Sequence, residues 1–235
     1  MKNLVFLCSG GGGNLRFVEA AIRFGWLPDA RLAGVLTDRD CAAKTFAQEN
    51  GIFERTMDFS QTGQQEVLEV LQRLSADSVV TNVHKILSPT LVSALPETLI
   101  NLHYSMLPAF GGVIGATPVK RALEYGATLL GVTAHQVSAE VDAGRPLLQA
   151  AIPVHEGDDA DGVMDVVFRV GCLVLLGALR RQLGEETQMR SRLLRLSERD
   201  VLFNPFGQVC VEWEEEAFWE TLKLPAEKGN ARARS

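Results

Sequence analysis

The sequence predicts an α/β fold, with a mostly parallel sheet, helices on both faces and a short C-terminal extension. Three observations lead to this prediction. Short apolar runs, such as 4–8, have the length and continuity of strands that are buried on both faces. Segments such as 14–24 carry apolar residues at helical spacing. Because the two kinds of segment alternate along most of the chain, they indicate βαβ units.

The first half of the chain alternates most regularly. The expected elements are strands at 4–8, 31–37, 78–83 and 98–103, and helices at 14–24, 41–49, 64–74 and 88–95. Pro96 ends the last of these helices, because proline cannot continue a helix beyond its first turn. Strands joined by helices in this way predict a parallel sheet.

The second half of the chain is less regular. The expected elements are a helix at 117–125, strands at 129–137 and 147–154 that could pair antiparallel, and a helix at 160–183. This last helix is rich enough in Val and Leu to be buried on more than one side. Beyond residue 186, an apolar run at 201–203, a turn at 204–207 and an apolar run at 209–213 predict a terminal hairpin. We expect one domain over 1–185, an extension over 186–235, and a frayed polar tail at 228–235.

Composition limits the possible functions. The chain has 235 residues, 46% hydrophobic and 22% charged, which is ordinary for a globular protein. Its net charge of −6 disfavours a nucleic-acid partner, because such partners attract basic surfaces. The four cysteines and four histidines are widely spaced and form no CxxC or HxxxH pair. We therefore expect reduced thiols and no metal.

The N-terminus predicts a strand and not a targeting segment. Its apolar run is too short for a signal peptide and ends in a glycine loop. No stretch approaches the roughly 20 apolar residues of a membrane span. The expected location is the cytoplasm, without a membrane partner.

The glycine loop, Ser9-Gly10-Gly11-Gly12-Gly13-Asn14, separates the first strand from the first helix. Such a junction presents free backbone N–H groups to an anion. The dinucleotide fingerprint GxGxxG fails, because Leu15 or Arg16 stands at the third glycine position. The loop is either an anion site or only a tight turn.

Two polar residues end the strand at 98–103. Asn101 and His103 lie two residues apart and therefore share one face of that strand. The carboxyl end of a core strand is where open α/β sheets bind ligands. The alternative is that both side chains only satisfy nearby backbone groups.

Five segments in one order resemble the folate-dependent formyltransferase family. They are SGGGGN at 9–14, VHKILSP at 83–89, NLHYSMLP at 101–108, GVTAHQV with DAG at 131–144, and QAAIPV at 149–154. The resemblance runs from about residue 4 to 183. It implies a Rossmann-like formyltransferase fold, with the catalytic domain over 1–185, and N10-formyltetrahydrofolate as the formyl donor.

The resemblance also implies the site. Asn101, His103 and Asp142 would be catalytic: Asn101 would hold the developing oxyanion, His103 would donate a proton, and Asp142 would pair with His103. Folate contacts would fall at His84, Lys85, Ile86, Leu87, Ser138, Ala139, Glu140 and Val141. The acceptor would bind at Gly11, Gly12, Gly13 and Asn14. His135 is either a second polar group of the site or a structural histidine of the core.

Departures from the family concern the acceptor. Two family positions of the glycine loop that usually carry Asn and Ser are glycine here, and 112–118 is closer to formyltransferases of amino sugars and aminoacyl-tRNA. Phe168 and Gly171 stand where purine enzymes carry polar residues for ribose, although Arg169 could bind an anion. Ribose hydroxyls left unpaired in a closed site would cost about 1–3 kcal/mol each.

The expected acceptor is therefore the amine or hydroxylamine of another small molecule, such as N5-hydroxyornithine in siderophore synthesis or an amino sugar. Glycinamide ribonucleotide is the alternative. Aminoacyl-tRNA is disfavoured by the acidic charge and by the lack of a further C-terminal domain, and a formyltetrahydrofolate hydrolase by the lack of an N-terminal regulatory domain. A non-catalytic folate- or nucleotide-binding module and a nicotinamide-dependent oxidoreductase fit less well.

The oligomeric state, monomer or homodimer, stays open. Apolar residues of the extension could cover either the domain itself or a partner subunit; they are Phe203, Phe206, Trp213, Phe218 and Trp219.

Overall fold

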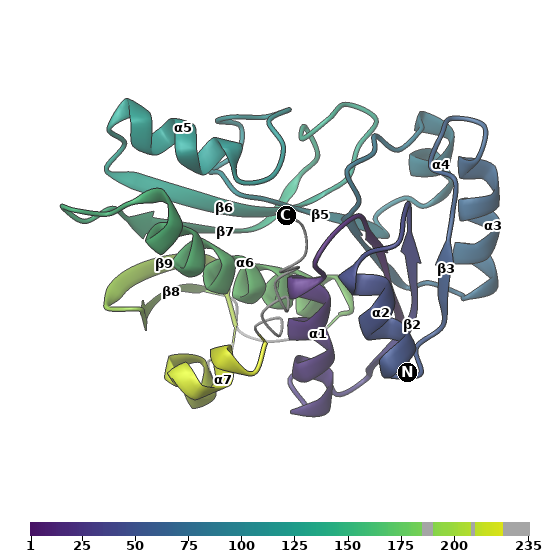
Figure 1. Ribbon diagram of the computed structural model, residues 1–235, viewed down its shortest axis with the longest axis horizontal. Helices are drawn as coiled ribbons and strands as arrows, with labels where there is room; N and C mark the ends of the chain where they lie inside the picture. The colour runs from purple at the N-terminus through teal and green to yellow at the C-terminus, as the bar shows by residue number, and fades with distance from the viewer. Residues whose placement is uncertain (185–189, 208–209, 223–235) are drawn as a thin grey trace, which may run out of the picture.

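The computed structural model describes residues 1–184, 190–207 and 210–222. Their strands form a nine-stranded sheet in the order β3-β2-β1-β4-β5-β6-β7-β9-β8 (Figure 1). The pairs from β3 to β5 are parallel, and the pairs from β5 to β8 are antiparallel. The predicted α/β fold and the antiparallel pairing of β6 with β7 are confirmed.

The parallel half of the sheet contains five strands with the helices that connect them. Its strands are β1 (Lys2–Cys8), β2 (Ala30–Thr37), β3 (Glu54–Thr56), β4 (Ser78–Asn82) and β5 (Leu99–His103). Its helices are α1 (Gly13–Arg23), α2 (Ala42–Glu49), α3 (Gln64–Arg73) and α4 (Pro89–Ala94). The short edge strand β3 was not predicted, because its residues, Glu54-Arg55-Thr56, are polar.

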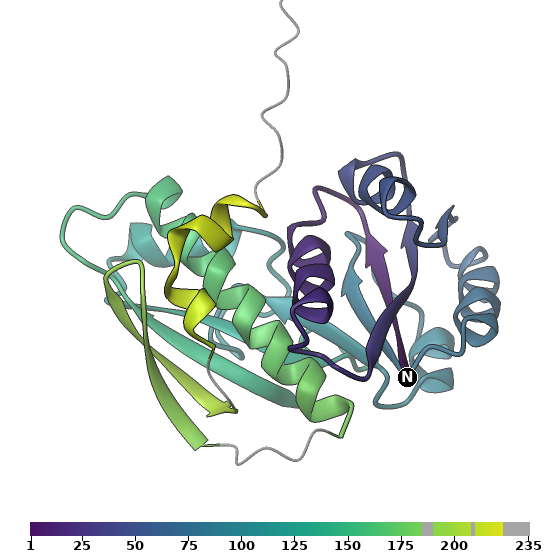
Figure 2. The ribbon, with the colours of Figure 1, turned by 90° about the horizontal axis from the view of Figure 1, so that it is seen from below.

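The antiparallel half follows. Its elements are α5 (Thr117–Tyr125), β6 (Leu129–Gln136), β7 (Pro146–Pro153), α6 (Ala160–Gln182), β8 (Arg190–Leu196), β9 (Arg199–Phe206), η1 (Val211–Glu214) and α7 (Glu216–Glu220). Figure 2 shows α6 running across this half of the sheet beside α1.

Both faces of the central strand β1 are buried. Leu4, Phe6 and Cys8 join a hydrophobic cluster with α1, α2 and α6, whereas Val5 and Leu7 join a second cluster with α3 and α4. Because successive residues of a strand point to opposite faces, a strand covered on both faces is apolar throughout. This explains why the first strand was recognisable from its sequence.

The long helix α6 corrects the expectation that no stretch approaches a membrane span. By length and composition alone it could cross a membrane, with a mean hydropathy of 2.0 over its most apolar window. Within the protein, however, 78% of that window is buried, as in the core helix of a globular domain. The apolar composition of α6 is therefore explained by its packing against β6, β7 and α1.

The C-terminal hairpin exists, but the predicted position was wrong. It consists of β8 and β9, and its turn is Ser197-Glu198, with φ of 46° and 64°. Positive φ at both central residues suits a two-residue hairpin turn, but neither residue is the Gly or Asn that usually signals one. The predicted turn at 204–207 begins inside β9, and Val211–Glu214 forms a 3₁₀ helix and not a strand. Residues 208–209 and the tail at 228–235 lie outside the described residues.

The aromatic side chains of the extension pack on the domain itself. Phe203, Phe206, Trp213, Phe218 and Trp219 are all buried and belong to the same hydrophobic cluster as α1 and α6. The ring of Trp219 stacks on that of Phe17 at 5.8 Å between centroids. Of the two expected roles of these residues, covering the domain is therefore the one that the structure supports.

Candidate active site

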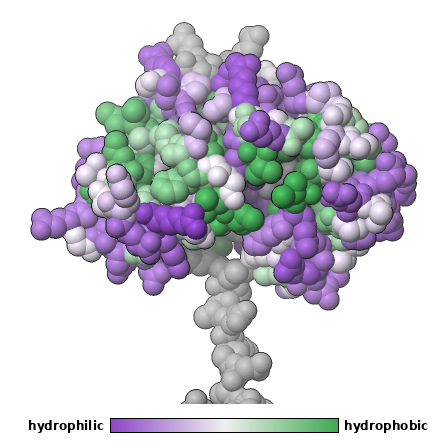
Figure 3. Space-filling view, turned by 90° about the horizontal axis from the view of Figure 1, so that it is seen from above, coloured by the Kyte–Doolittle hydropathy of each residue, from purple (hydrophilic) through white to green (hydrophobic). Residues whose placement is uncertain are grey.

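A cavity of about 470 Å³ lies at the carboxyl ends of β1, β4 and β5. It contains every predicted site residue except Glu140, which is exposed and outside its lining. Seen from above, the molecule has hydrophobic side chains gathered around the middle of its surface (Figure 3). The position and size of the cavity are those of a small-molecule site in an open α/β sheet.

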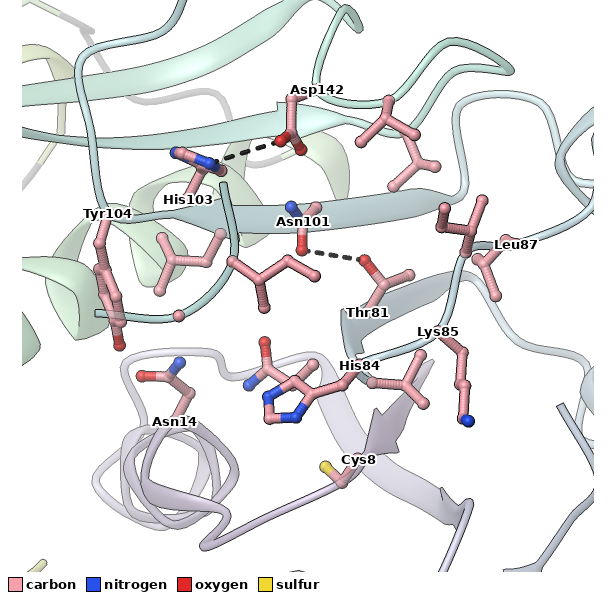
Figure 4. Close-up of a pocket in the computed structure, with 18 of the residues that line it drawn as sticks. Cys8, Asn14, Thr81, His84, Lys85, Leu87, Asn101, His103, Tyr104 and Asp142 are labelled. Atoms are coloured by element: carbon pink, nitrogen blue, oxygen red, sulfur yellow. Dashed lines mark hydrogen bonds and ion pairs between the residues drawn. The ribbon is translucent and has the colours of Figure 1, made fainter. Parts of the chain in front are cut away.

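Asn101 lies at the centre of the cavity and is held from two sides (Figure 4). The Thr81 hydroxyl lies 3.3 Å from Asn101 Oδ1, and His135 Nε2 lies 3.2 Å from Asn101 Nδ2. This fixes the amide with its oxygen toward β4 and its nitrogen toward β6. An amide nitrogen has two hydrogens, so one remains for a ligand.

His135 is part of the site and not only of the core. It pairs with Asn101 across β5 and β6, and its Nδ1 donates to the backbone oxygen of Gln136 at 2.9 Å. Burial lowers the pKa of His135 below its ordinary value, which keeps the ring neutral at neutral pH. A neutral ring with a proton on Nδ1 leaves Nε2 free to accept from Asn101. His135 therefore orients the amide of Asn101.

His103 is buried beside Asn101 at the end of β5. Its Nε2 lies 3.0 Å from the backbone oxygen of Val113 and 3.4 Å from Asp142 Oδ2. Both are acceptors, so Nε2 carries a hydrogen. Nδ1 lies 2.9 Å from the Ser105 hydroxyl, which itself donates to the backbone oxygen of Ala109. His103 therefore offers a proton on the side of the ring that faces Asp142.

Asp142 lies beside both histidines. It lies in the loop after β6 with a left-handed φ of 55°, and its side chain is only 10% exposed. Its Oδ1 lies 3.6 Å from His135 Nε2, and its Oδ2 accepts a hydrogen bond of 2.8 Å from the backbone of Gly112. The carboxylate is thus the one acidic side chain among the described residues that line the cavity.

The glycine loop forms another wall. Gly12 has φ of 70°, and a Cβ added there would lie 2.9 Å from Ala43 Cβ. A Cβ on Gly13 would lie 2.7 Å from Phe168 Cε2. Both positions therefore need glycine, one for its conformation and for space, the other for space alone. Asn14, at the start of α1, is buried and accepts a bond of 3.4 Å from Cys172 Sγ.

The predicted folate segments form the opposite wall. His84, Lys85, Ile86 and Leu87 line the cavity, with Ile86 73% exposed and Leu87 buried. From the loop after β6, Ser138, Ala139 and Val141 line it as well. The Ser138 hydroxyl donates to the backbone oxygen of Glu140, which holds this loop in a turn.

Arg169 does not reach the cavity, so its expected role as an anion site was wrong. Its guanidinium lies 2.7 Å from Asp165 Oδ2 and 2.6 Å from Glu216 Oε2, and it also lies over the Trp219 ring. The helical neighbour Phe168 lines the cavity instead. Adjacent helical residues point about 100° apart, so that Phe168 faces the cavity while Arg169 is directed to Asp165 and Glu216.

Sequence reasoning missed three contributors. Thr81 orients Asn101 from a neighbouring strand, and the backbones of Gly112 and Val113 contact Asp142 and His103 from a loop. A threonine at a strand end and a backbone atom in a loop carry no motif of their own. The cavity contains no metal cluster: within the described ranges, no three His, Cys, Asp or Glu side chains are arranged to hold an ion.

Comparison with known proteins agrees with this geometry. The formyl transferase family model matches residues 2–179. Phosphoribosylglycinamide formyltransferase, chloroplastic, of Arabidopsis thaliana is 33% identical over 166 residues, and formyltetrahydrofolate deformylase of Bacillus subtilis is 30% identical over 179. These alignments cover 67% and 74% of this chain, and the chain spans little more than half of both relatives, 57% of each.

A solved structure gives the same result for the fold. Glycinamide ribonucleotide transformylase 1 from Symbiobacterium toebii superposes with a TM-score of 0.72 at 30% identity, covering 86% of this chain and 94% of that one. The Rossmann-like α/β fold expected from the sequence is thereby confirmed. Because the family model matches well over half of the chain, the protein belongs to the folate-dependent formyl transferase family.

Proposed function

We propose that this enzyme transfers the formyl group of N10-formyltetrahydrofolate to the amine or hydroxylamine nitrogen of a small molecule. The observation that carries the proposal is the meeting of Asn101, His103 and Asp142 in one cavity. An amide donor, an imidazole donor and a carboxylate are the groups that acyl transfer to nitrogen requires.

The three side chains have distinct roles. The free N–H of Asn101 donates to the formyl oxygen as negative charge develops on it, a contribution of roughly 3–4 kcal/mol in comparable sites. In the reaction, the hydrogen on His103 Nε2 turns from the Val113 carbonyl to the same oxygen. Asp142, 3.4 Å from His103 Nε2, receives the proton that the attacking nitrogen loses. His103 then passes its Nε2 proton to the folate nitrogen as the bond to the formyl carbon breaks, and the proton held by Asp142 replaces it.

The two co-substrates occupy opposite walls. The folate lies along His84–Leu87 and Ser138–Val141, where Ile86, Leu87 and Val141 supply apolar lining. The acceptor enters beside Gly11, Gly12, Gly13 and Asn14. Asn101 lies between these two walls in Figure 4, and the proposal therefore has donor and acceptor meet beside its amide.

The side chain of Phe168, which lines the acceptor wall, supports an acceptor other than glycinamide ribonucleotide. Phe168 offers no hydrogen bond to ribose hydroxyls, and Arg169 is turned away to Asp165 and Glu216. N5-hydroxyornithine and an amino sugar are examples of the proposed acceptor class.

Glycinamide ribonucleotide is the second candidate, because the relatives from Arabidopsis and Symbiobacterium are named for it. The Bacillus relative is named a deformylase, which makes water a third acceptor to test.

The experiment mixes the enzyme with N10-formyltetrahydrofolate and follows release of the deformylated folate, with glycinamide ribonucleotide, N5-hydroxyornithine or no acceptor added. Release that depends on the hydroxylamine supports the proposal. Release with the ribonucleotide alone favours the purine reaction, and equal release without acceptor favours hydrolysis. If the folate neither binds nor reacts, formyl transfer itself is wrong.

A further inference from the structure

Two groups of residues line the cavity around Asn101, His103 and Asp142, and each group is called an arm. One arm lies between residues 83–87 and 137–141, where we placed the folate. The other lies between the glycine loop and two aromatic side chains, Tyr104 and Phe168 (Figure 4 labels Tyr104 beside Asn14). This second space, lined by Gly11–Asn14, Tyr104 and Phe168, is called the acceptor arm below.

Phe168 lies directly on the glycine loop. A Cβ added to Gly13 would come within 2.7 Å and 3.0 Å of the ring atoms Cε2 and Cζ. The ring is only partly buried, so part of its surface faces the cavity. The acceptor arm therefore has an aromatic face beside the start of α1.

Tyr104 provides a second aromatic surface. Its ring packs so closely on α6 that a Cβ on Gly171 would lie 2.9 Å from Tyr104 Cε1. Burial raises the pKa of Tyr104 to about 12, so the phenol stays uncharged near neutral pH. Beside it, Cys172 Sγ donates to Asn14 Oδ1 at 3.4 Å. This side-chain oxygen of the wall is therefore already hydrogen-bonded.

The residues that define the acceptor arm carry no side-chain cation; Lys85, which lines the same cavity, belongs to the folate arm. None of the residues that line the acceptor arm, Gly11–Asn14, Tyr104 and Phe168, is charged at neutral pH. The arginine next along α6, Arg169, is held by Asp165 and Glu216. A phosphate or carboxylate in this arm would meet backbone N–H groups and aromatic carbon but no side-chain charge.

We propose that the acceptor carries its nitrogen on an apolar chain or ring that packs against Phe168 and Tyr104, with no phosphate attached. This inference rests on the proposed function. Among the acceptor classes named above it selects an aliphatic or aromatic hydroxylamine or amine over an amino sugar or a ribonucleotide. The nitrogen attacks the formyl carbon, the bond from that carbon to the folate nitrogen breaks, and the proton of the attacking nitrogen ends on the folate nitrogen.

The test measures kcat/KM for formylation of N-methyl-, N-propyl-, N-pentyl- and N-benzylhydroxylamine, with glycinamide ribonucleotide as the phosphorylated acceptor. Each buried methylene raises kcat/KM by about fourfold, the value expected for its transfer from water. The best hydroxylamine exceeds the ribonucleotide by at least about tenfold. Binding of N10-formyltetrahydrofolate is measured separately by fluorescence.

Two variants test whether the dependence of kcat/KM on the length of the acceptor arises at Phe168. Phe168→Gln keeps a side chain of similar length but makes it polar. The fold-increase in kcat/KM per added methylene therefore falls toward one, while the affinity for the folate stays as in the wild type. Phe53→Gln is the matched control, because Phe53 is 48% exposed and lies outside the cavity lining. It leaves both quantities unchanged.

The outcomes separate the two proposals. A kcat/KM that is flat along the series, or a ribonucleotide preferred over every hydroxylamine, overturns the apolar acceptor and leaves formyl transfer standing. An unchanged gain per methylene in Phe168→Gln also overturns it. Absence of folate binding and of any formylation overturns the proposed function itself.

Discussion

The polar centre of the cavity and its acceptor arm are held in place by different forces. At the centre, Asn101, His103 and Asp142 are fixed by hydrogen bonds to groups on β4, β6 and the loop that contains Gly112 and Val113. In the acceptor arm, Gly13 and Phe168 are fixed by close packing between α1 and α6. Hydrogen bonds specify orientation, whereas packing specifies volume. The chemistry and the choice of acceptor can therefore change independently of each other.

The strongest test of the polar centre is His103→Asn. The substituted amide cannot transfer the proton that His103 carries on Nε2, so kcat for formyl transfer falls by about 10²–10⁴-fold, the range for loss of a general acid. Steady-state kinetics with a small hydroxylamine measure this. Folate affinity, measured by fluorescence, stays within a few-fold of the wild type. A kcat near that of the wild type would remove His103 from the reaction.

The next largest effect is expected for Asn101→Ala. Removal of one donor to the developing oxyanion lowers kcat by about 10²–10³-fold, with little change in KM. Stopped-flow measurement of a single turnover separates this step from product release. A rise in KM as large as the expected fall in kcat would instead mean that Asn101 binds the ground state, contrary to the role assigned to it.

The acceptor arm is tested by Gly13→Ala. The added methyl group would lie 2.7 Å from Phe168 Cε2, and such overpacking costs about 1–3 kcal/mol. We expect a higher KM for the acceptor and a lower free energy of unfolding, both partly restored by Phe168→Leu in the same chain. A double-mutant cycle measures the coupling between the two sites. Additive effects of the two substitutions would show that the contact between Gly13 and Phe168 determines neither the KM for the acceptor nor the free energy of unfolding.

The smallest effect, on the free energy of unfolding, is expected for Asp158→Asn. Asp158 lies outside both the polar centre and the acceptor arm. Arg199 of the hairpin donates to both oxygens of Asp158 and holds the pKa of that carboxyl at about 2, below its ordinary 3.8. A carboxyl with a depressed pKa stabilises the fold above pH 3.8, and this contribution is lost as the pH falls toward 2. Because the pair is close to the surface, we discount the contribution to about 1 kcal/mol.

Urea unfolding at pH 6 and at pH 3 checks this prediction. The variant should be less stable than the wild type at pH 6, and the difference should shrink at pH 3. The kcat of the variant should equal that of the wild type at neutral pH. A changed kcat would mean that the hairpin influences the polar centre after all.

The proximity of Asn101, His103 and Asp142 could be predicted from the sequence because these residues follow local rules. Asn101 and His103 alternate on one strand, and Asp142 follows the next strand in the sheet, so strand geometry alone brings them near one another. The glycine loop was visible for a similar reason, since Gly12 needs a left-handed backbone.

The acceptor arm could not be predicted in the same way. The contact of Phe168 with Gly13, and the ion pairs that take Arg169 to Asp165 and Glu216, depend on the rotation of α6 about its own axis. That rotation is set by packing on several elements and leaves no pattern in a helix that is apolar on nearly every side. The hairpin turn at Ser197-Glu198 was missed because Ser and Glu, unlike Gly and Asn, are not residues that usually indicate a positive φ.

The stacking of Trp219 on Phe17 has a consequence for how this protein is made. The two residues lie near opposite ends of the described chain, and their rings stack at 5.8 Å with an interplanar angle of 2°. Chains emerge from the ribosome N-terminus first, and contacts of such long sequence separation form late. Until residues 213–219 emerge, α1 lacks the cover that Trp213, Phe218 and Trp219 provide, and the aromatic rings of Phe17 and Trp26 stay accessible to chaperones. The helix that carries the glycine loop is therefore synthesised well before the segment that completes its cover.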